Sequence, residues 1–120
     1  MTSEEFIDAM KKYIETDSIE IVKENLQSPP GRYPSQKDVM MSQFYNSLSE
    51  EDRSKINTII KEAVQTTFFE IFCVIDGVKF IEDSPEKGIF KLIFEKNGKQ
   101  YLLNSSDDEF LHDLYNTEPD

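Results

Sequence analysis

The dipeptide Asn97-Gly98 lies between two segments in which apolar and polar side chains alternate. Asn-Gly is the most typical sequence of a two-residue β-hairpin turn, because both central residues of a type I′ turn need positive φ. A two-residue turn also fixes the register, since each residue before it must face one particular residue after it. The expected pairs are Lys96 with Lys99, Glu95 with Gln100, Phe94 with Tyr101, Ile93 with Leu102 and Leu92 with Leu103.

We expect this hairpin to belong to an antiparallel β-meander of about three strands. The strands are predicted at residues 78–82, 88–95 and 99–104, with a turn at 83–87. Alternation gives the meander one apolar face that should pack on helices, made by Phe90, Leu92, Phe94, Tyr101 and Leu103. The wetter face keeps a modest apolar strip, formed by Ile89, Ile93 and Leu102.

Four helices are predicted before the meander, because apolar residues recur there at helical spacing. Their expected ranges are about 3–15, 16–28, 36–48 and 49–75. Each range begins at residues that are typical of N-caps, namely Thr2 or Ser3, the run Thr16-Asp17-Ser18, Ser35 and Ser49. The Pro-rich residues 28–35 are predicted to form a stiff loop between the second and third helices.

The end of the fourth helix is ambiguous. Residues 68–75 are apolar on nearly all sides and rich in β-branched and aromatic side chains, so the pattern also permits a strand. The helical periodicity, however, runs unbroken from Ile56 to Ile71, and Asp76-Gly77 provides a natural stop. We therefore favour a buried helix and keep the strand as the alternative.

A short C-terminal helix is predicted after the meander. Residues 106–109, Ser-Asp-Asp-Glu, provide a cap and an acidic first turn, and apolar side chains follow at helical spacing up to Tyr115. A chain of 120 residues has the length of one domain. The sequence thus predicts a single α+β domain over residues 1–120, in which four N-terminal helices pack on a small meander that a short helix follows.

Charge and cysteine content limit the classes of partner and compartment. The formal charge is −11, from 24 acidic and 13 basic residues, and it repels phosphate groups, so we expect neither nucleic acid nor membrane as a partner. The single Cys73 cannot form an internal disulfide, and the first residues lack the features of a signal peptide. We expect a cytoplasmic protein without metal or other cofactor, since the sequence shows no metal-ligand spacing and no Gly-rich phosphate loop.

The sequence contains no recognisable catalytic motif. Asp113 should point away from its neighbour His112 on a helix, and apolar surroundings should keep the thiol of Cys73 inert. An enzyme would need catalytic groups that converge on a cleft from distant positions. The set considered for this alternative is Asp76, Glu82, His112 and Tyr115.

Residue types favour a protein-binding role instead. Arg and Tyr are enriched at binding hot spots, and acidic side chains attract a basic partner. The residues proposed for partner binding are Arg32, Tyr33, Ile93, Leu102, Asp107, Asp108 and Glu109. A structural homodimer through the strip of Ile89, Ile93 and Leu102 is a further alternative.

Four groups of residues resemble a family of small, uncharacterised, acidic bacterial proteins. They are Pro29-Pro30-Gly31-Arg32, residues 44–49 (Phe-Tyr-Asn-Ser-Leu-Ser), Asp76-Gly77-Val78 with Ile81-Glu82, and Leu102-Leu103-Asn104 with residues 111–114 (Leu-His-Asp-Leu). In size, acidity and α+β layout the chain is also similar to immunity proteins of bacterial polymorphic toxin systems. That resemblance implies a non-enzymatic binding module, an immunity-type inhibitor that neutralises a basic toxin by binding it.

Overall fold

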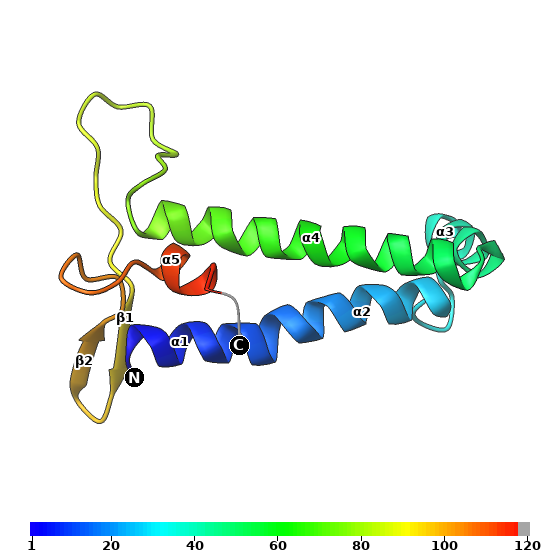
Figure 1. The fold of residues 1–120 in the computed structure, drawn as a ribbon, viewed down its shortest axis with the longest axis horizontal. Helices are drawn as coiled ribbons and strands as arrows, with labels where there is room; N and C mark the ends of the chain where they lie inside the picture. Colours follow the sequence, from blue (N-terminus) through cyan, green and yellow to red (C-terminus); the bar gives the residue numbers. More distant parts are fainter. Residues whose placement is uncertain (118–120) are drawn as a thin grey trace. The chain divides into compact units, whose positions relative to one another are not determined.

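Helices form most of the chain in the computed structural model, which describes residues 1–117 (Figure 1). The chain divides into two units, and we describe each by itself. The helical unit is Ile14–Gln65, and the α+β unit comprises Met1–Tyr13 and Thr66–Asp120. Helices and an antiparallel sheet occur together, as the predicted α+β class requires.

Four helices precede the sheet. They are α1 (Ser3–Ala9), α2 (Thr16–Gln27), α3 (Gln36–Ser47) and α4 (Glu50–Ile75), and a π-helical segment, Met10–Glu15, joins α1 to α2. None of the helices within residues 1–117 is both long and apolar enough to cross a membrane.

Serine and threonine caps start three of these helices. The side chain of Thr2 accepts a hydrogen bond from the amide of Glu5, as Ser35 does from Asp38. The hydroxyl of Ser49 accepts in the same way from the amide of Asp52, at 3.1 Å. Each cap satisfies an amide that the first helical turn leaves without a backbone partner, and the three predicted caps are confirmed.

α2 begins at Thr16 as predicted, but the predicted cap at Thr16-Asp17-Ser18 is wrong. Glu15 has right-handed helical dihedrals and makes no side-chain cap, so the backbone continues from the π-helical segment directly into α2. Polar residues that could cap a helix can also lie on its exposed side, where their hydroxyls and carboxylates contact water. Cap-type residues therefore mark a helix start only when the preceding backbone is extended.

Residues 68–75 are helical, which decides the ambiguous segment in favour of the predicted buried helix. α4 ends at Ile75, and two residues later Gly77 has a φ of +78°, a left-handed conformation that favours glycine. The amides of Val78 and Lys79 both donate to the carbonyl of Cys73, at 3.0 and 3.2 Å. These bonds satisfy a carbonyl at the helix end and turn the chain away from the helix axis.

Aromatic packing makes the core of the α+β unit. Its buried residues are Ile7 from α1, Phe72 from α4, and Leu111 and Tyr115 from the short helix α5 (Leu111–Tyr115). Phe72 lies 5.4 Å from Tyr115 between ring centroids, and Phe68 stacks on Tyr115 at 5.8 Å. α5 consequently lies between α1 and the last turns of α4 (Figure 1).

The hairpin has the predicted register. Strands β1 (Ile93–Lys96) and β2 (Lys99–Leu102) pair antiparallel, with Ile93 opposite Leu102 and Lys96 opposite Lys99. Asn97 and Gly98 have φ of 53° and 75°, as a type I′ turn requires. The amide of Leu103 donates to the carbonyl of Leu92 at 2.8 Å, which extends the pairing by one position.

The structure has two strands, so the prediction of a third strand at residues 78–82 is wrong within the described part of the chain. Residues 78–92 instead form a long loop, called the arm here (Figure 1). Side chains take over backbone hydrogen bonding in the arm: the carboxylate of Glu82 accepts from the amide of Gly88 at 2.8 Å. β1 starts at Ile93 and not at the predicted residue 88.

The expected apolar face of the sheet is only partly covered. Leu103 is buried and Leu92 packs against the core, but Phe90 and Tyr101 are 54% and 37% exposed. Because the arm leaves the sheet before β1, Phe90 has no strand neighbours that would hold it against the helices. The alternation of the sequence therefore predicted the face correctly only near the base of the hairpin.

The predicted helix start at residues 106–109 is also wrong. Asp107 and Asp108 form a turn in which their amides donate to the hydroxyl and the carbonyl of Ser105. α5 begins at Leu111, and Phe110 occupies its N-cap without a side-chain cap bond. The acidic run thus lies in a loop before the helix, with its carboxylates exposed.

Replacing Asn97 by Pro should destabilise the hairpin, because Pro holds φ near −65° whereas the turn needs a φ of 53° here. We expect the free energy of unfolding to fall by about 2–3 kcal/mol. Asn97→Gly is the matched control and should change it by less than about 1 kcal/mol, since glycine adopts positive φ freely. Urea unfolding of the three proteins measures both values, and equal stability of the Pro variant would contradict the turn.

Candidate partner-binding site

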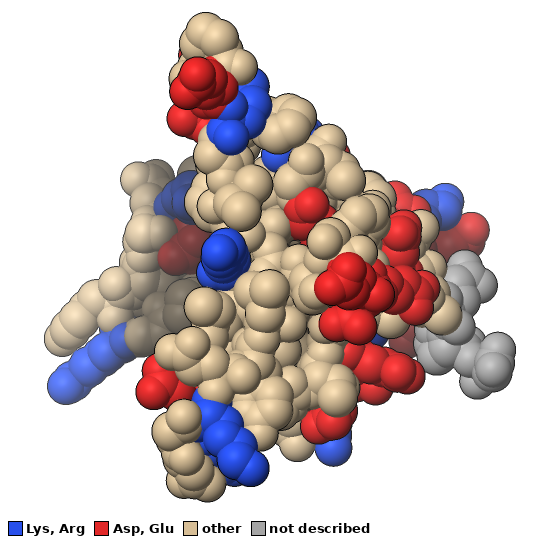
Figure 2. All heavy atoms as spheres, turned by 90° about the vertical axis from the view of Figure 1, so that its left-hand side faces the viewer, with Lys and Arg blue, Asp and Glu red and all other residues tan. Residues whose placement is uncertain are grey.

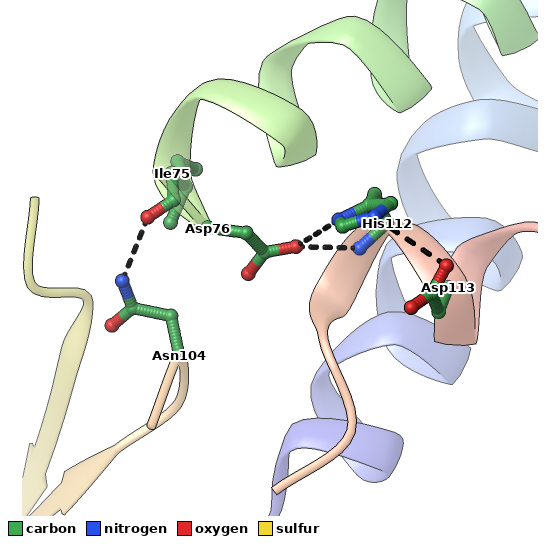
Figure 3. A network of polar contacts seen from close by, with 5 residues as sticks. All are labelled: Ile75, Asp76, Asn104, His112 and Asp113. Atoms are coloured by element: carbon green, nitrogen blue, oxygen red, sulfur yellow. Dashed lines mark hydrogen bonds and ion pairs between the residues drawn. The ribbon is translucent and has the colours of Figure 1, made fainter. Parts of the chain in front are cut away.

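Asp76 and His112, 36 positions apart in the sequence, form a buried polar contact (Figure 3). One carboxylate oxygen, Oδ2, accepts a hydrogen bond from the backbone amide of His112 at 2.8 Å and lies 2.6 Å from its ring Nδ1. The side chain of Asp76 is fully buried and that of His112 is 13% exposed. The carboxylate at the end of α4 thereby holds the first turn of α5.

Asn104 makes a second connection from the same region (Figure 3). Its amide nitrogen donates to the carbonyls of Ile75 and Phe90, each at 2.8 Å, and its oxygen accepts from the amide of Leu92 at 2.8 Å. One side chain therefore links the end of α4 to both the arm and the hairpin. The side chain of Asn104 thus bonds Phe90 and Leu92 on the edge where β1 would otherwise continue its ladder with β2.

These contacts bring together two of the four residues in the enzyme alternative, Asp76 and His112. The other two lie elsewhere: Glu82 is on the arm, where its carboxylate binds the amide of Gly88, and Tyr115 is in the aromatic core. The ring of His112 is enclosed by Phe69, at 5.8 Å, and by Phe110, at 5.4 Å between centroids. Asp76 and His112 are thus placed to join α4 to α5.

Sequence reasoning missed this pairing. The prediction that Asp113 points away from His112 is wrong as well, since Oδ1 of Asp113 lies 3.4 Å from Nε2 of the ring. The position of Asp76-Gly77 at a helix end indicates that the chain turns there, but it does not identify residue 112 as the partner of residue 76.

Cys73 is buried among apolar residues, as predicted. Burial raises the pKa of its thiol, and the carboxylates of Glu70 and Asp76 raise it further, against a smaller opposite effect of Lys79. A higher pKa means less thiolate at neutral pH, and the thiolate is the nucleophilic form. Within residues 1–117, no cluster of three or more His, Cys, Asp or Glu side chains could hold a metal ion.

An acidic pocket of about 440 Å³ opens on the α+β unit. Its walls come from the first turn of α1, the end of β2 and the turn before α5. The side chains that give it chemical character are Glu4, Tyr101, Leu102, Asp108, Glu109 and Leu114. Three carboxylates therefore share a pocket with an aromatic ring and two leucines.

The pocket gathers three of the seven residues that the sequence assigned to partner binding, namely Leu102, Asp108 and Glu109. Ile93 is paired with Leu102, and both are nearly half exposed, at 48% and 44%. Asp107 lies in the adjoining turn, next to Asp108. The hairpin and this turn thus supply five of the seven predicted residues from one unit.

Arg32 and Tyr33 belong to the helical unit, on the loop between α2 and α3. The guanidinium of Arg32 lies 5.7 Å from the ring centroid of Tyr33, and Tyr33 is 87% exposed. They form an exposed pair within the helical unit.

Negative charge is concentrated on the α+β unit. Its sequence ranges contain 15 Asp and Glu but only 7 Lys and Arg, so this unit accounts for most of the net charge. On the face shown in Figure 2, several acidic side chains lie close together on the right-hand side, and others are scattered over the surface, as the basic ones are. No ion pair joins Glu4, Asp108 or Glu109 to a cation among the residues that the structure describes.

Comparison with known proteins adds no assignment. The chain matches no protein-family model, no curated protein and no solved structure.

Asp76→Ala should destabilise the α+β unit, because it leaves the buried amide of His112 without an acceptor. We expect a loss of about 1.5–3 kcal/mol in the free energy of unfolding, the range for hydrogen bonds to charged groups. Asp113→Ala is the control, since this 57% exposed carboxylate contacts the same ring more weakly. Chemical denaturation followed by circular dichroism compares the two, and equal losses would contradict the role of Asp76.

Proposed function

We propose that this chain is a non-enzymatic protein-binding module that receives a Lys or Arg side chain of a basic protein in its acidic pocket. The observation that carries the proposal is the grouping of Glu4, Asp108 and Glu109, without a cation from residues 1–117, around an apolar wall. Unpaired carboxylates in a recess attract a cation more specifically than carboxylates on a flat surface do, because the walls fix its position.

The rest of the pocket matches the stem of such a side chain. Lys and Arg carry a long aliphatic chain that packs on apolar surface while the charged head reaches its partners. Leu102 and Leu114 offer that surface, and the ring of Tyr101 can stack with a guanidinium. An Arg side chain can therefore contact the carboxylates, the leucines and the aromatic ring of the pocket, whereas a simple cation would interact mainly with the carboxylates.

The arm supplies additional surface of the kind that protein interfaces use. Five of its large apolar side chains are at least half exposed: Val78, Phe80, Ile81, Ile89 and Phe90. Exposed apolar side chains grouped on one segment are typical of interaction surfaces. The arm and the pocket both belong to the α+β unit, which carries most of the negative charge.

The most concrete form of this proposal is an immunity-type inhibitor of a basic toxin. Negative charge would accelerate encounter with such a target, and the pocket together with aromatic and apolar contacts would supply the affinity. Support comes from the charge of −11, from the pocket and from the resemblance in size and layout to immunity proteins.

The arginine pocket can be tested with a small probe. We expect N-acetyl-arginine methylamide, added to ¹⁵N-labelled protein, to shift the amide resonances of Glu4, Leu102, Asp108 and Glu109. The neutral isostere N-acetyl-citrulline methylamide should shift them several-fold less at equal concentration, because it lacks the charge. Asp108→Asn with Glu109→Gln should weaken the arginine response.

The matched control removes two carboxylates from elsewhere on the same unit. Asp83→Asn with Glu86→Gln lowers the negative charge equally, but both residues lie on the exposed arm. This control should leave the pocket response within about twofold of the unmodified protein, since exposed charges at a distance are screened. Equal weakening by both double variants, or shifts spread over all acidic residues, would contradict a specific pocket.

A further inference from the structure

A second pocket lies within the helical unit and differs in chemistry from the acidic one. It has a volume of about 310 Å³ and is lined by Gln27, Tyr45, Glu50, Arg53, Ser54 and Asn57. Gln27 is the last residue of α2, Tyr45 lies on α3, and the other four occupy the first turns of α4 (Figure 1). The lining is polar throughout, and only Glu50 is acidic.

The pocket is built on a fixed junction between α2 and α3. The backbone carbonyl of Gln27 accepts hydrogen bonds from the side-chain Nδ2 of Asn46, at 2.9 Å, and from the hydroxyl of Ser42, at 3.4 Å. Ser42 and Tyr45 are the buried residues of α3 and lie on the same face of the helix. Ser42 contacts α2, and Tyr45 lines the pocket. The walls are therefore held by internal contacts.

Arg53 is the only cation in the pocket lining. It forms no ion pair with any residue between 1 and 117, whereas Lys55 on the same helix lies within 4 Å of both Glu51 and Asp52. Neither of the two arginines, Arg32 and Arg53, forms an ion pair in the described part of the chain, and Arg53 is the one that lines a pocket. Its guanidinium is thus available to a ligand.

Asn57 contributes the hydrogen-bond donors of its side-chain amide to the pocket. The hydroxyl of Tyr45, which is only 3% exposed, donates to Oδ1 of Asn57 at 2.8 Å. This bond occupies the oxygen of the amide and leaves its NH₂ group as the end that can reach a ligand. Arg53, Asn57 and the hydroxyl of Ser54 together make the pocket rich in hydrogen-bond donors.

We propose that this pocket binds a carboxylate group, held by Arg53 in a fork and by the amide of Asn57. A planar carboxylate matches two parallel N–H groups of a guanidinium. A phosphate dianion suits the site less, because Glu50 and the overall charge of −11 repel two negative charges more than one. The volume lies at the lower end of the range for ligand sites, about 300–1,000 Å³, and so fits a small acid or one acidic side chain.

The proposal predicts that the charge of Glu50 weakens the binding of a carboxylate. It stands three positions before Arg53, so a rotation of either side chain would let the two pair and compete with the ligand. Removing its charge should then strengthen binding. If anions were attracted only non-specifically to the surface, removing the charge of Glu50 would raise their affinity no more than removing the charge of another acidic residue.

The test uses acetate, succinate, N-acetyl-glutamate methylamide and inorganic phosphate, titrated into the ¹⁵N-labelled protein at constant ionic strength. We expect the carboxylates to shift the amides of Arg53, Ser54 and Asn57 with saturation, and phosphate to bind more weakly. Tighter binding of succinate identifies a free small acid as the natural ligand, and tighter binding of the glutamate derivative identifies an acidic side chain.

Variants make the assignment specific. Arg53→Gln should weaken carboxylate binding by about tenfold or more, and Glu50→Gln should tighten it about threefold. Lys55→Gln removes an equal positive charge outside the pocket and should change the affinity by less than about twofold. Equal effects of the Arg53 and Lys55 variants, tighter binding of phosphate, or no gain from Glu50→Gln in a protein with unchanged circular dichroism would overturn the proposal.

Discussion

The α+β unit depends on two buried side chains that supply hydrogen bonds where the backbone has no regular partner. Asp76 accepts from the amide of His112 and contacts its ring, and Asn104 connects Ile75 with both Phe90 and Leu92. A two-stranded hairpin alone is marginally stable in water. Side-chain bonds to the end of α4 therefore decide where the hairpin and α5 lie. The other oxygen of Asp76, Oδ1, is buried without a hydrogen-bond partner in the described residues, so the stabilising effect comes from Oδ2.

This arrangement also creates the acidic pocket. The hydroxyl of Ser3, in the first turn of α1, donates to the carbonyl of Leu103 at 2.7 Å, directly after the end of β2. The turn that carries Asp108 and Glu109 runs from the hairpin to α5, and α5 is held by Asp76 and the aromatic core. Loss of these connections would separate the carboxylates of Glu4 and Glu109. The proposed binding of a basic partner thus rests on contacts that lie away from the binding surface.

Local signals in the sequence were sufficient for elements whose determinants are near in sequence. The type I′ turn at Asn97, the caps at Ser35 and Ser49 and the helical state of Phe72 follow from neighbouring residues. The missing third strand and the late start of α5 do not, because both depend on partners that only the fold provides. Asn104 replaces strand pairing at Phe90, and no local pattern predicts that an amide 14 positions away will do so.

The residues of the candidate sites also differ in whether the sequence alone could identify them. The acidic run at residues 107–109 was recognisable by charge, although two of its carboxylates, Asp108 and Glu109, line a pocket and the run does not start a helix. Glu4 and Tyr101 of that pocket, and Arg53 and Asn57 of the other, could not be selected from many similar residues. Their importance arises from convergence, which needs the positions of several elements at once. Sequence composition therefore supports the proposal of a basic partner, but it selected only some of the residues in the proposed site.

Native-state hydrogen exchange of two backbone amides tests the central claim most directly. The amides of Leu92 and His112 donate to side chains, not to a helix or strand partner. If Asn104 and Asp76 hold the unit together, both amides should exchange at least about 100-fold more slowly than in an unstructured peptide. Asn104→Ala should remove the protection of Leu92 while the amides in the middle of α4 stay protected. Exchange of both amides at the unstructured rate in the unmodified protein would contradict the account.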